Sequence, residues 1–346
     1  MMNKEFLYEL LDTMSVSGHE IPLQKKVIAE MTPWCDEIRT DYTGNVICVL
    51  NPDAPYKVLL AGHADEIGLI VTHIQGDGLL RVCKAGGIYP HVYPGHKVVV
   101  HGASGPIYGA VLNHHGLVKD GLKAEDLYID IGAKDEADAR QYVEEGDPVI
   151  LHTDHQEMLN GLLTARGIDD RCGAFIVMEA LKLARERGCK IGVYAASTVG
   201  EETTGRGANW AACGVKANAA IAVDVTYATD VPGTKPEESG SVKLGNGPVI
   251  CNSSLCNKKI NDLLKTCAKE HKIPYQVESF IGRTCTDGDT IHLAGTGTTT
   301  ALVSLPLRYM HNPAEVCALS DVENCIELIA RFLCTVDETT DFDPFH

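Results

Sequence analysis

The hydrophobic positions of the first sixty residues predict two helices followed by two strands. Apolar side chains recur at three- and four-residue spacing in residues 4–14 and again in 21–31, which places them on one face of each helix. Two short apolar runs without that spacing follow at residues 46–50 and 57–61, and turn-forming Gly, Asn or Pro residues flank them. The second run stops just before His63 and so exposes this residue at the carboxyl end of a strand.

The pattern changes between residues 69 and 161. Short runs of alternating apolar and polar residues, such as 97–101 and 108–112, are broken by glycine turns and show little helical spacing. We therefore predict a small β-rich domain at residues 69–161, inserted into a main domain made of residues 1–68 and 162–346.

Helices and strands alternate in the rest of the chain. The predicted helices are residues 171–187, which Gly188 ends, residues 255–270, and a closing helix that starts with the capping box Ser320-Asp321-Val322-Glu323. The predicted strands are residues 191–197, 219–225 and 299–305. Such alternation is typical of an α/β fold in which helices cover both faces of a sheet.

Charge and composition narrow the classes of partner. The chain has 47 acidic and 30 basic residues and a formal charge of −17, which repels nucleic-acid phosphates and anionic membrane surfaces. No apolar run approaches the roughly 18 residues that a membrane span needs, and the start resembles an amphipathic helix rather than a secretion signal. We expect a soluble cytoplasmic protein that binds neither nucleic acid nor membrane.

The 13 cysteines are an odd number and form no C-x-x-C pair. Cys48, Cys267, Cys325 and Cys334 lie inside apolar patterns. We interpret them as small buried hydrophobic residues in a reducing compartment, in preference to a disulfide framework or a thiolate metal site.

Metal-competent side chains follow several of the predicted strands. His63, the pair Glu201-Glu202, Asp224 and His311 each lie at or just beyond a strand end, where open α/β sheets bind ligands. Asp169 instead opens the helix after the inserted domain. One such carboxylate is more often a helix cap or a solvated loop residue, but five candidate ligands in corresponding places predict a two-metal hydrolase, because oxygen and imidazole donors suit Zn²⁺.

Two local spacings suggest roles around that site. In His63-Ala64-Asp65, the i, i+2 spacing allows the carboxylate to hold the second imidazole nitrogen, although a chance surface pair has the same spacing. In Glu201-Glu202, neighbouring extended side chains point to different sides. One glutamate can therefore bind metal while the other faces water as a general base.

Five segments together resemble the glutamyl-aminopeptidase or TET-type family of dinuclear metallo-aminopeptidases. The segments, in chain order, are Ala61-Gly62-His63-Ala64-Asp65-Glu66-Ile67-Gly68, Gly167-Ile168-Asp169-Asp170-Arg171, Thr198-Val199-Gly200-Glu201-Glu202, Val223-Asp224-Val225 and Arg308-Tyr309-Met310-His311-Asn312-Pro313. The resemblance runs through essentially the whole chain. It implies an α/β peptidase core with a mixed sheet flanked by helices, interrupted by a small β-barrel-like domain used for dimerisation.

The resemblance also implies the role of each site residue. Asp169 would bridge two divalent ions, His63 and Asp224 would complete one metal site, and Glu202 and His311 the other. Glu201 would be the catalytic general base, and Asp65 would hold His63. Zn²⁺ suits the ligands best, and Co²⁺ or Mn²⁺ also fits. The implied function is removal of single amino-terminal residues from short peptides by a homo-oligomer built of dimers, up to a dodecamer.

Some positions depart from the family pattern. Gly200 replaces a usual glutamine, and Thr203-Thr204 replace a Val-Gly, which changes the turn around the glutamate pair. The stretch Cys285–Asp289 matches only in part, so Asp287 is a weaker candidate for substrate binding. In the inserted domain, His114 and His115 invite a metal interpretation, but a solvated loop is the preferred one.

Three alternatives compete with this interpretation, and only the first of them stays fully open. The same metal site would serve a deacylase that acts on small N-acyl compounds. A glycosidase needs two opposed carboxylates about 5–9.5 Å apart, which adjacent glutamates do not easily provide. A catalytically silent assembly protein would lack a ligand or the base, and none of the expected positions is missing.

Overall fold

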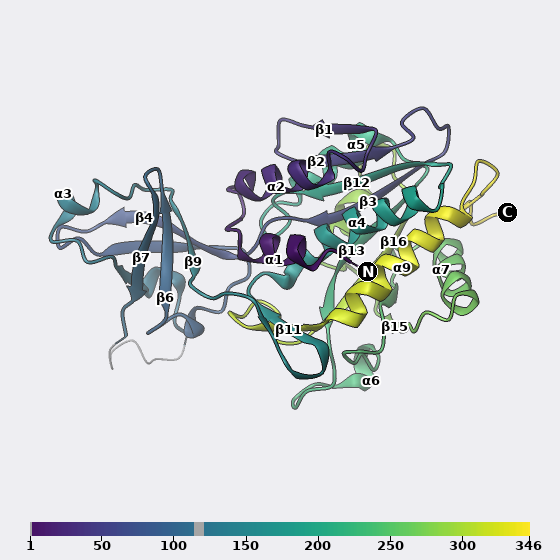
Figure 1. Cartoon of the computed structure of the whole chain (residues 1–346). Helices are drawn as coiled ribbons and strands as arrows, with labels where there is room; N and C mark the ends of the chain where they lie inside the picture. The colour runs from purple at the N-terminus through teal and green to yellow at the C-terminus, as the bar shows by residue number, and fades with distance from the viewer. Residues whose placement is uncertain (1, 114–120) are drawn as a thin grey trace.

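The largest sheet has eight strands and forms the middle layer of the α/β part of the molecule (Figure 1). The computed structural model describes residues 2–113 and 121–346. Across the sheet the strands are β1 (Glu37–Thr40), β2 (Val46–Leu50), β12 (Gly192–Thr198), β3 (Lys57–His63), β13 (Ala219–Tyr227), β16 (Thr300–Leu307), β14 (Val249–Asn252) and β15 (Gln276–Ser279). Strands β12, β3, β13 and β16 run parallel to one another, whereas β2 and β14 join them antiparallel. The four parallel strands therefore end at the same edge of a mixed sheet.

Helices cover both faces of this sheet. One face packs against α1 (Lys4–Asp12), α2 (Ile21–Met31), α4 (Ile168–Glu186), α7 (Lys258–Glu270) and α9 (Leu319–Thr335). The other packs against α5 (Arg206–Val215) and the short α8 (Asp287–Ile291). The predicted α/β class, with a mixed sheet between helices, is confirmed.

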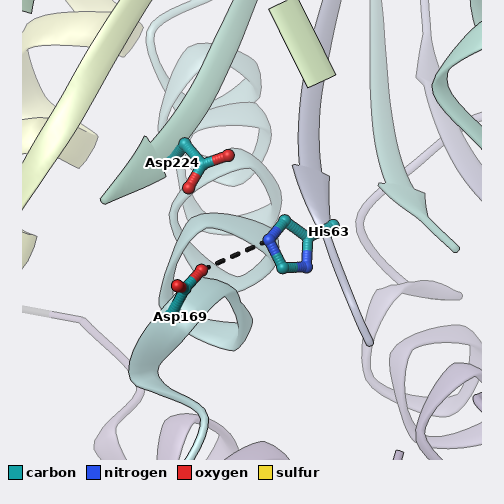
Figure 2. Close-up of side chains that lie close together, drawn as sticks. All are labelled: His63, Asp169 and Asp224. Atoms are coloured by element: carbon teal, nitrogen blue, oxygen red, sulfur yellow. Dashed lines mark ion pairs between the residues drawn. The ribbon is translucent and has the colours of Figure 1, made fainter. Parts of the chain in front are cut away.

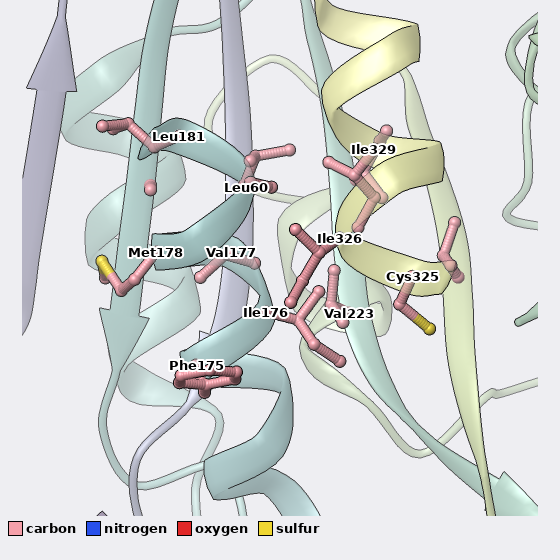
Figure 3. Close-up of a cluster of buried hydrophobic side chains, with 14 of the residues drawn as sticks. Leu60, Phe175, Ile176, Val177, Met178, Leu181, Val223, Cys325, Ile326 and Ile329 are labelled. Atoms are coloured by element: carbon pink, nitrogen blue, oxygen red, sulfur yellow. The ribbon is translucent and has the colours of Figure 1, made fainter. Parts of the chain in front are cut away.

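Helix α4 is central to the larger hydrophobic core (Figure 3). It packs against α9 and against β3 and β13 at the same time. Ile176 of α4, Leu60 of β3 and Val223 of β13 are at most 1% exposed. Burial of one side chain of this size contributes about 1.5–3 kcal/mol. The apolar face of α4 thus fixes the first turn of the helix, which carries Asp169, relative to the strand ends.

The inserted segment forms a closed barrel that stands to one side of the α/β body (Figure 1). Its strands, in order around the barrel, are β4 (Gly68–Ile74), β5 (Leu80–Ala85), β8 (Tyr128–Asp130), β7 (Gly105–Val111), β6 (Lys97–Gly102) and β9 (Pro148–Leu151). All of them pair antiparallel around an apolar core of their own. The prediction of an inserted barrel-like domain is confirmed, while its limits at residues 69 and 161 stay a prediction.

A small antiparallel sheet joins the end of the barrel segment to the body. It consists of β10 (Gln156–Glu157), β11 (Leu162–Ala165) and β17 (Glu315–Ala318). Two short helices, α3 (Glu136–Ala139) and α6 (Pro236–Ser239), lie in connections. Within the described residues, no helix is long and apolar enough to cross a bilayer. His114 and His115 lie outside the described residues.

Two sequence-based expectations are wrong. The closing helix does not start with a capping box at Ser320, because α9 begins at Leu319 after Ala318 and has no side-chain cap. Asp321 instead turns inward and accepts hydrogen bonds from the amides of Gly245 and Gly247, at 2.7 and 2.8 Å. A partner so distant in sequence leaves no local signal.

The cysteines are all free thiols, and all lie among the described residues. Cys48, Cys267 and Cys325 are buried as expected. Cys334 is exposed and lies in the last turn of α9. The apolar pattern around Cys334 therefore predicted its burial wrongly.

Gly62 lets α4 approach β3 closely beside the metal-competent residues. A Cβ atom at Gly62 would lie 2.3 Å from the carbonyl carbon of Gly173, which is backbone and cannot move aside alone. A side chain there would push β3 and α4 apart, directly next to His63.

We therefore expect Gly62→Ala to lower the free energy of unfolding by about 1–3 kcal/mol, the usual range for overpacking. Gly214→Ala is the matched control: Gly214 lies in α5 with open space around its Cβ direction, so alanine should stabilise by about 0.5–1 kcal/mol. Urea unfolding of the two variants checks the difference. Equal stability of both would contradict the role assigned to this close contact.

Candidate metal centre

The candidate ligands converge at the edge where the parallel strands end (Figure 2). His63 is the last residue of β3, and Asp224 lies three residues before the end of β13. Asp169 comes from the first turn of α4, where its backbone is not helical (φ −75°, ψ 105°). All three are nearly inaccessible to solvent. A strand end, a neighbouring strand and a helix start therefore meet at one buried point.

Asp169 stands between two imidazoles. Its Oδ1 lies 3.3 Å from Nε2 of His63, and its Oδ2 lies 3.3 Å from Nε2 of His311. Because each carboxylate oxygen faces a different imidazole, the two oxygens are placed to serve two separate ions. This is the geometry that a bridging carboxylate needs.

Two groups of ligand atoms share this carboxylate. One consists of His63, Asp169 and Asp224, the other of Asp169, Glu202 and His311, and within each group the ligand atoms lie within 4.8 Å of one another. Nε2 of His311 is also 3.5 Å from Oε1 of Glu202. The structure thus brings together all five residues that the sequence suggested as metal ligands.

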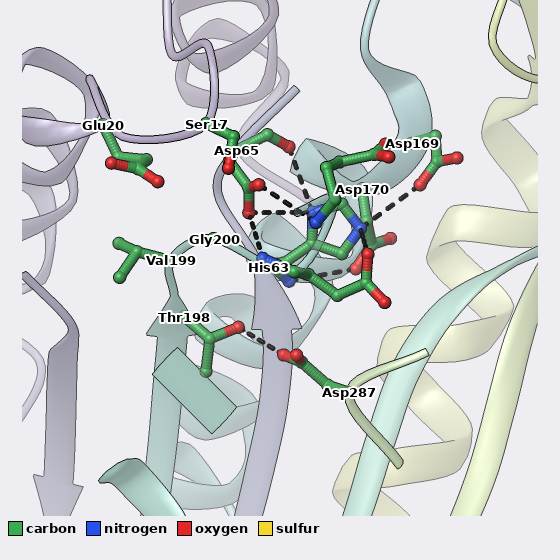
Figure 4. A network of polar contacts seen from close by, with 12 residues as sticks. Ser17, Glu20, His63, Asp65, Asp169, Asp170, Thr198, Val199, Gly200 and Asp287 are labelled. Atoms are coloured by element: carbon green, nitrogen blue, oxygen red, sulfur yellow. Dashed lines mark hydrogen bonds and ion pairs between the residues drawn. The ribbon is translucent and has the colours of Figure 1, made fainter. Parts of the chain in front are cut away.

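Asp65 holds the turn that carries the glutamate pair (Figure 4). Its two carboxylate oxygens accept hydrogen bonds from the backbone amides of Glu201 and Glu202, at 3.0 and 3.2 Å. Oδ1 of Asp65 lies 3.4 Å from Nδ1 of His63, but the backbone carbonyl of Asp65 is closer, at 3.0 Å. A carbonyl only accepts, so Nδ1 carries the proton and Nε2 is free to face the site.

Glu201 belongs to neither ligand group among the described residues. Its Oε2 lies 3.8 Å from Nε2 of His63, and its side chain is 16% exposed. Glu201 therefore lies beside the candidate metal ligands and belongs to neither of the two ligand groups described above.

Asp287 starts α8 and lies at the base of the site (Figure 4). Its Oδ2 accepts a hydrogen bond from the Thr198 hydroxyl, and its Oδ1 is buried without a partner among the described residues. Burial raises the pKa of this carboxyl to about 6. Asp287 thus presents one unpaired carboxylate oxygen close to the ligand cluster.

Sequence reasoning missed two buried carboxylates that hold ligand backbones. Asp170 accepts from the amides of His63 and Gly173, at 3.2 and 3.0 Å. Glu315 accepts from the amides of Asp169 and His311, at 3.2 and 2.8 Å. Sequence position gave a weak signal for both residues, since Asp170 directly follows the candidate ligand Asp169 and Glu315 comes four residues after His311.

Burial and crowding of like charge shift the protonation of the cluster. Burial raises the pKa of Asp224 well above its usual value and, with the help of nearby carboxylates, raises that of Glu201 to about 10. Burial opposes a charged imidazole, but the hydrogen bond with Asp169 and that with Glu202 outweigh it and raise the pKa of His311 to about 11. The protein therefore does not supply enough positive charge to balance the carboxylates of this cluster.

Two divalent cations fit this arrangement. The donor set consists of imidazole nitrogens and carboxylate oxygens, which suits Zn²⁺ and comparable first-row ions. Cations would also supply the positive charge that the buried carboxylates lack. The donor atoms of the ligands, their burial and the position of Asp169 between the two groups therefore all favour a dinuclear metal site.

Comparison with known proteins identifies the family to which the chain belongs. Residues 44–328 match the model of the family described as M42 glutamyl aminopeptidase. Lysyl aminopeptidase of Pyrococcus furiosus is 30% identical over 99% of this chain and 100% of its own. The solved TET aminopeptidase of a marine-sediment Thaumarchaeota archaeon is 30% identical with a TM-score of 0.90, and the match covers 97% of this chain and 96% of that one. The TET1 peptidase of Pyrococcus horikoshii is 28% identical with a TM-score of 0.86, covering 96% and 99%.

The fold and the site define a metal-dependent hydrolase. The chain belongs to the M42 glutamyl aminopeptidase family and is a metallo-aminopeptidase, a hydrolase of peptide bonds. The family that the sequence motifs predicted is confirmed, together with a dinuclear metal site as the property of that family.

Metal binding should release protons. Without metal both histidines have a raised pKa, that of His311 to about 11, so each imidazole holds a second proton at neutral pH and must lose it when its Nε2 binds metal. The apparent affinity for Zn²⁺ should therefore rise as the pH is raised from about 6 to about 8. Titration calorimetry in buffers of different ionisation enthalpy counts the protons. Affinity that stays constant across this range, without proton release, would contradict the assigned protonation.

Proposed function

We propose that the chain removes single amino-terminal residues from short peptides, with Glu201 as the general base. The proposal rests on the different positions of the two glutamates relative to the candidate ligands. Glu202 joins a ligand group with Asp169 and His311, whereas Glu201 joins none within the part of the chain that the structure describes and lies beside His63. A base must reach the attacking water without being consumed as a ligand.

The proposed ligand set has a shared carboxylate. Asp169 would bridge the two ions, His63 and Asp224 would complete one site, and Glu202 and His311 the other. When bound, the ions polarise the scissile carbonyl and make a nearby water more acidic. Asp65 and Glu315 keep the backbones of these ligands in place through the amide contacts given above.

Glu201 would take a proton from the attacking water as the new carbon–oxygen bond forms. It would return that proton to the leaving nitrogen as the peptide carbon–nitrogen bond breaks, so no other proton donor is needed.

The acidic surroundings favour a free amino terminus. A substrate α-ammonium group is attracted by the buried carboxylates, and Asp287 has an oxygen without a partner among the described residues. An N-acyl group lacks this positive charge. Side-chain preference is a separate matter, since the family description names a glutamyl enzyme and one relative a lysyl enzyme.

We expect Glu201→Gln to lower kcat by about 10²- to 10⁴-fold, the usual contribution of a general base, while both ions stay bound. The matched control is Glu186→Gln, because Glu186 is exposed at the opposite end of α4 from Asp169. Release of amine from free and N-acetylated aminoacyl-arylamides and short peptides measures activity, and elemental analysis counts metal.

The substrate panel separates the two enzymatic candidates. Metal-dependent release from free amino termini alone supports the aminopeptidase, and cleavage of the N-acetylated substrates alone would replace it with a deacylase. Full activity of Glu201→Gln would refute the assigned base.

The inserted barrel is proposed as the dimer contact, with further assembly of dimers up to a dodecamer. The TET1 peptidase of Pyrococcus horikoshii, to which this chain is similar over 96% of its length, can assemble into a tetrahedron or a large octahedral shell. The exposed Tyr108 and Tyr142 give the barrel aromatic surface of the kind enriched in protein interfaces.

Native mass spectrometry should therefore find even multiples of the 37.3 kDa chain. In a mixture of ¹⁴N- and ¹⁵N-labelled protein, Lys97 and Lys134 of the barrel should form crosslinks between differently labelled chains. A monomer, or intermolecular crosslinks confined to the α/β body, would contradict the dimer contact.

A further inference from the structure

A turn of the inserted barrel reaches the metal centre. Gly86 and Gly87 directly follow β5, and the carbonyl oxygen of Gly87 lies 3.0 Å from Nδ1 of His311. These two residues are 224 positions apart in the chain. Because the carbonyl only accepts, it fixes the proton of His311 on Nδ1 and directs Nε2 toward Asp169 and Glu202.

Only a residue without a side chain fits at position 87. A Cβ atom there would lie 2.8 Å from both Cε1 and Nδ1 of His311. The backbone of Gly87 is not in the left-handed region, unlike that of Gly86 with φ +79°. Space for the imidazole, and not backbone conformation, is therefore what requires glycine.

The two imidazoles are held in different ways. Nδ1 of His63 lies 3.0 Å from the carbonyl of Asp65, two residues further along the same segment. Nδ1 of His311 depends on the barrel for the equivalent contact, and its side chain is 22% exposed against 2% for His63. The support of one ligand is thus local, whereas that of the other comes from a separate domain.

Glu315 and Gly87 divide the support of His311. Glu315 accepts from the His311 amide at 2.8 Å and holds a backbone with φ +62°, which a residue with a side chain adopts rarely. That contact fixes where the Cα atom lies and leaves the ring free to rotate. The contact with Gly87 is the one that sets the ring orientation.

We propose that Gly87 is a positioning residue for His311, and that the barrel thereby completes only the metal site of Asp169, Glu202 and His311. The proposal rests on the ligand set of the proposed function. Partners that orient a metal-bound histidine typically contribute 10- to 100-fold to metal affinity. The site of His63 and Asp224 has no such dependence on the barrel.

The test compares Gly87→Ala with Gly76→Ala in the full-length protein. Gly76 lies in the barrel turn between β4 and β5, has an ordinary backbone and open space around its Cβ direction, and so is a matched control. Titration of metal-free protein with Zn²⁺ against a chromophoric chelator gives the number of bound ions and the affinity for each.

Gly87→Ala should bind one ion with wild-type affinity and the other about 10- to 100-fold more weakly, and raised Zn²⁺ should restore its activity. Gly76→Ala should bind both ions as the wild type does. The double variant Gly87→Ala/His311→Ala removes the steric conflict, so it should unfold at the same temperature as His311→Ala and keep the same single ion.

Two single variants separate this proposal from the ligand set beneath it. His311→Ala and Asp224→Ala should each lose one ion, and Gly87→Ala combined with Asp224→Ala should weaken the ion that remains. If both single variants behave so but Gly87→Ala binds two ions normally, or weakens both equally, the positioning role is wrong. If His311→Ala keeps two ions at full affinity, the ligand set itself fails and this proposal with it.

Discussion

The shared carboxylate of Asp169 is the constraint on which the rest of the site depends. Its two oxygens each lie 3.3 Å from a different imidazole nitrogen, one of His63 and one of His311. This arrangement requires the first turn of α4 to lie close to the end of β3, and Gly62 permits that approach. The hydrophobic packing of α4 between the sheet and α9 therefore has a direct chemical consequence, because it fixes the distance between two metal sites.

Many carboxyl groups are buried at this point, which costs free energy, and the fold offsets that cost in two ways. Carboxyl groups that are not ligands accept hydrogen bonds from backbone amides, as Asp65, Asp170 and Glu315 do, and these hydrogen bonds help to order the ligands. Next to them, Glu66 forms ion pairs with the buried Arg166 and Arg171, and a buried ion pair is stable only when its partners are well matched. Among the described residues, the ligand carboxylates pair only with the two histidine ligands and with no arginine or lysine, which is why cations fit there.

The place of the insertion in the chain explains how the barrel takes part in the site. The barrel begins five residues after His63, and its segment returns to the body shortly before Asp169. The outgoing connection therefore starts at the candidate ligand His63 and the returning one ends at Asp169. The ion pair of Glu66 with Arg166 ties the two segments together. A domain attached in this way is held close to the strand ends, so that the turn at Gly87 can contact His311.

The sequence alone determined the ligand types and many, though not all, of the helices and strands, since β1, β14, β15 and α5 were not predicted. Hydrophobic spacing located α1, α2 and the parallel strands to within a few residues, and strand ends marked His63 and Glu202, because that information is local. Tertiary structure alone decided which groups support the ligands. Glu315 contacts the distant Asp169, Gly87 leaves space for the distant His311, and Asp321 contacts the distant Gly245. None of these contacts produces a periodic pattern in the sequence. Contacts of that kind exist only once the sheet, the helices and the barrel have packed together.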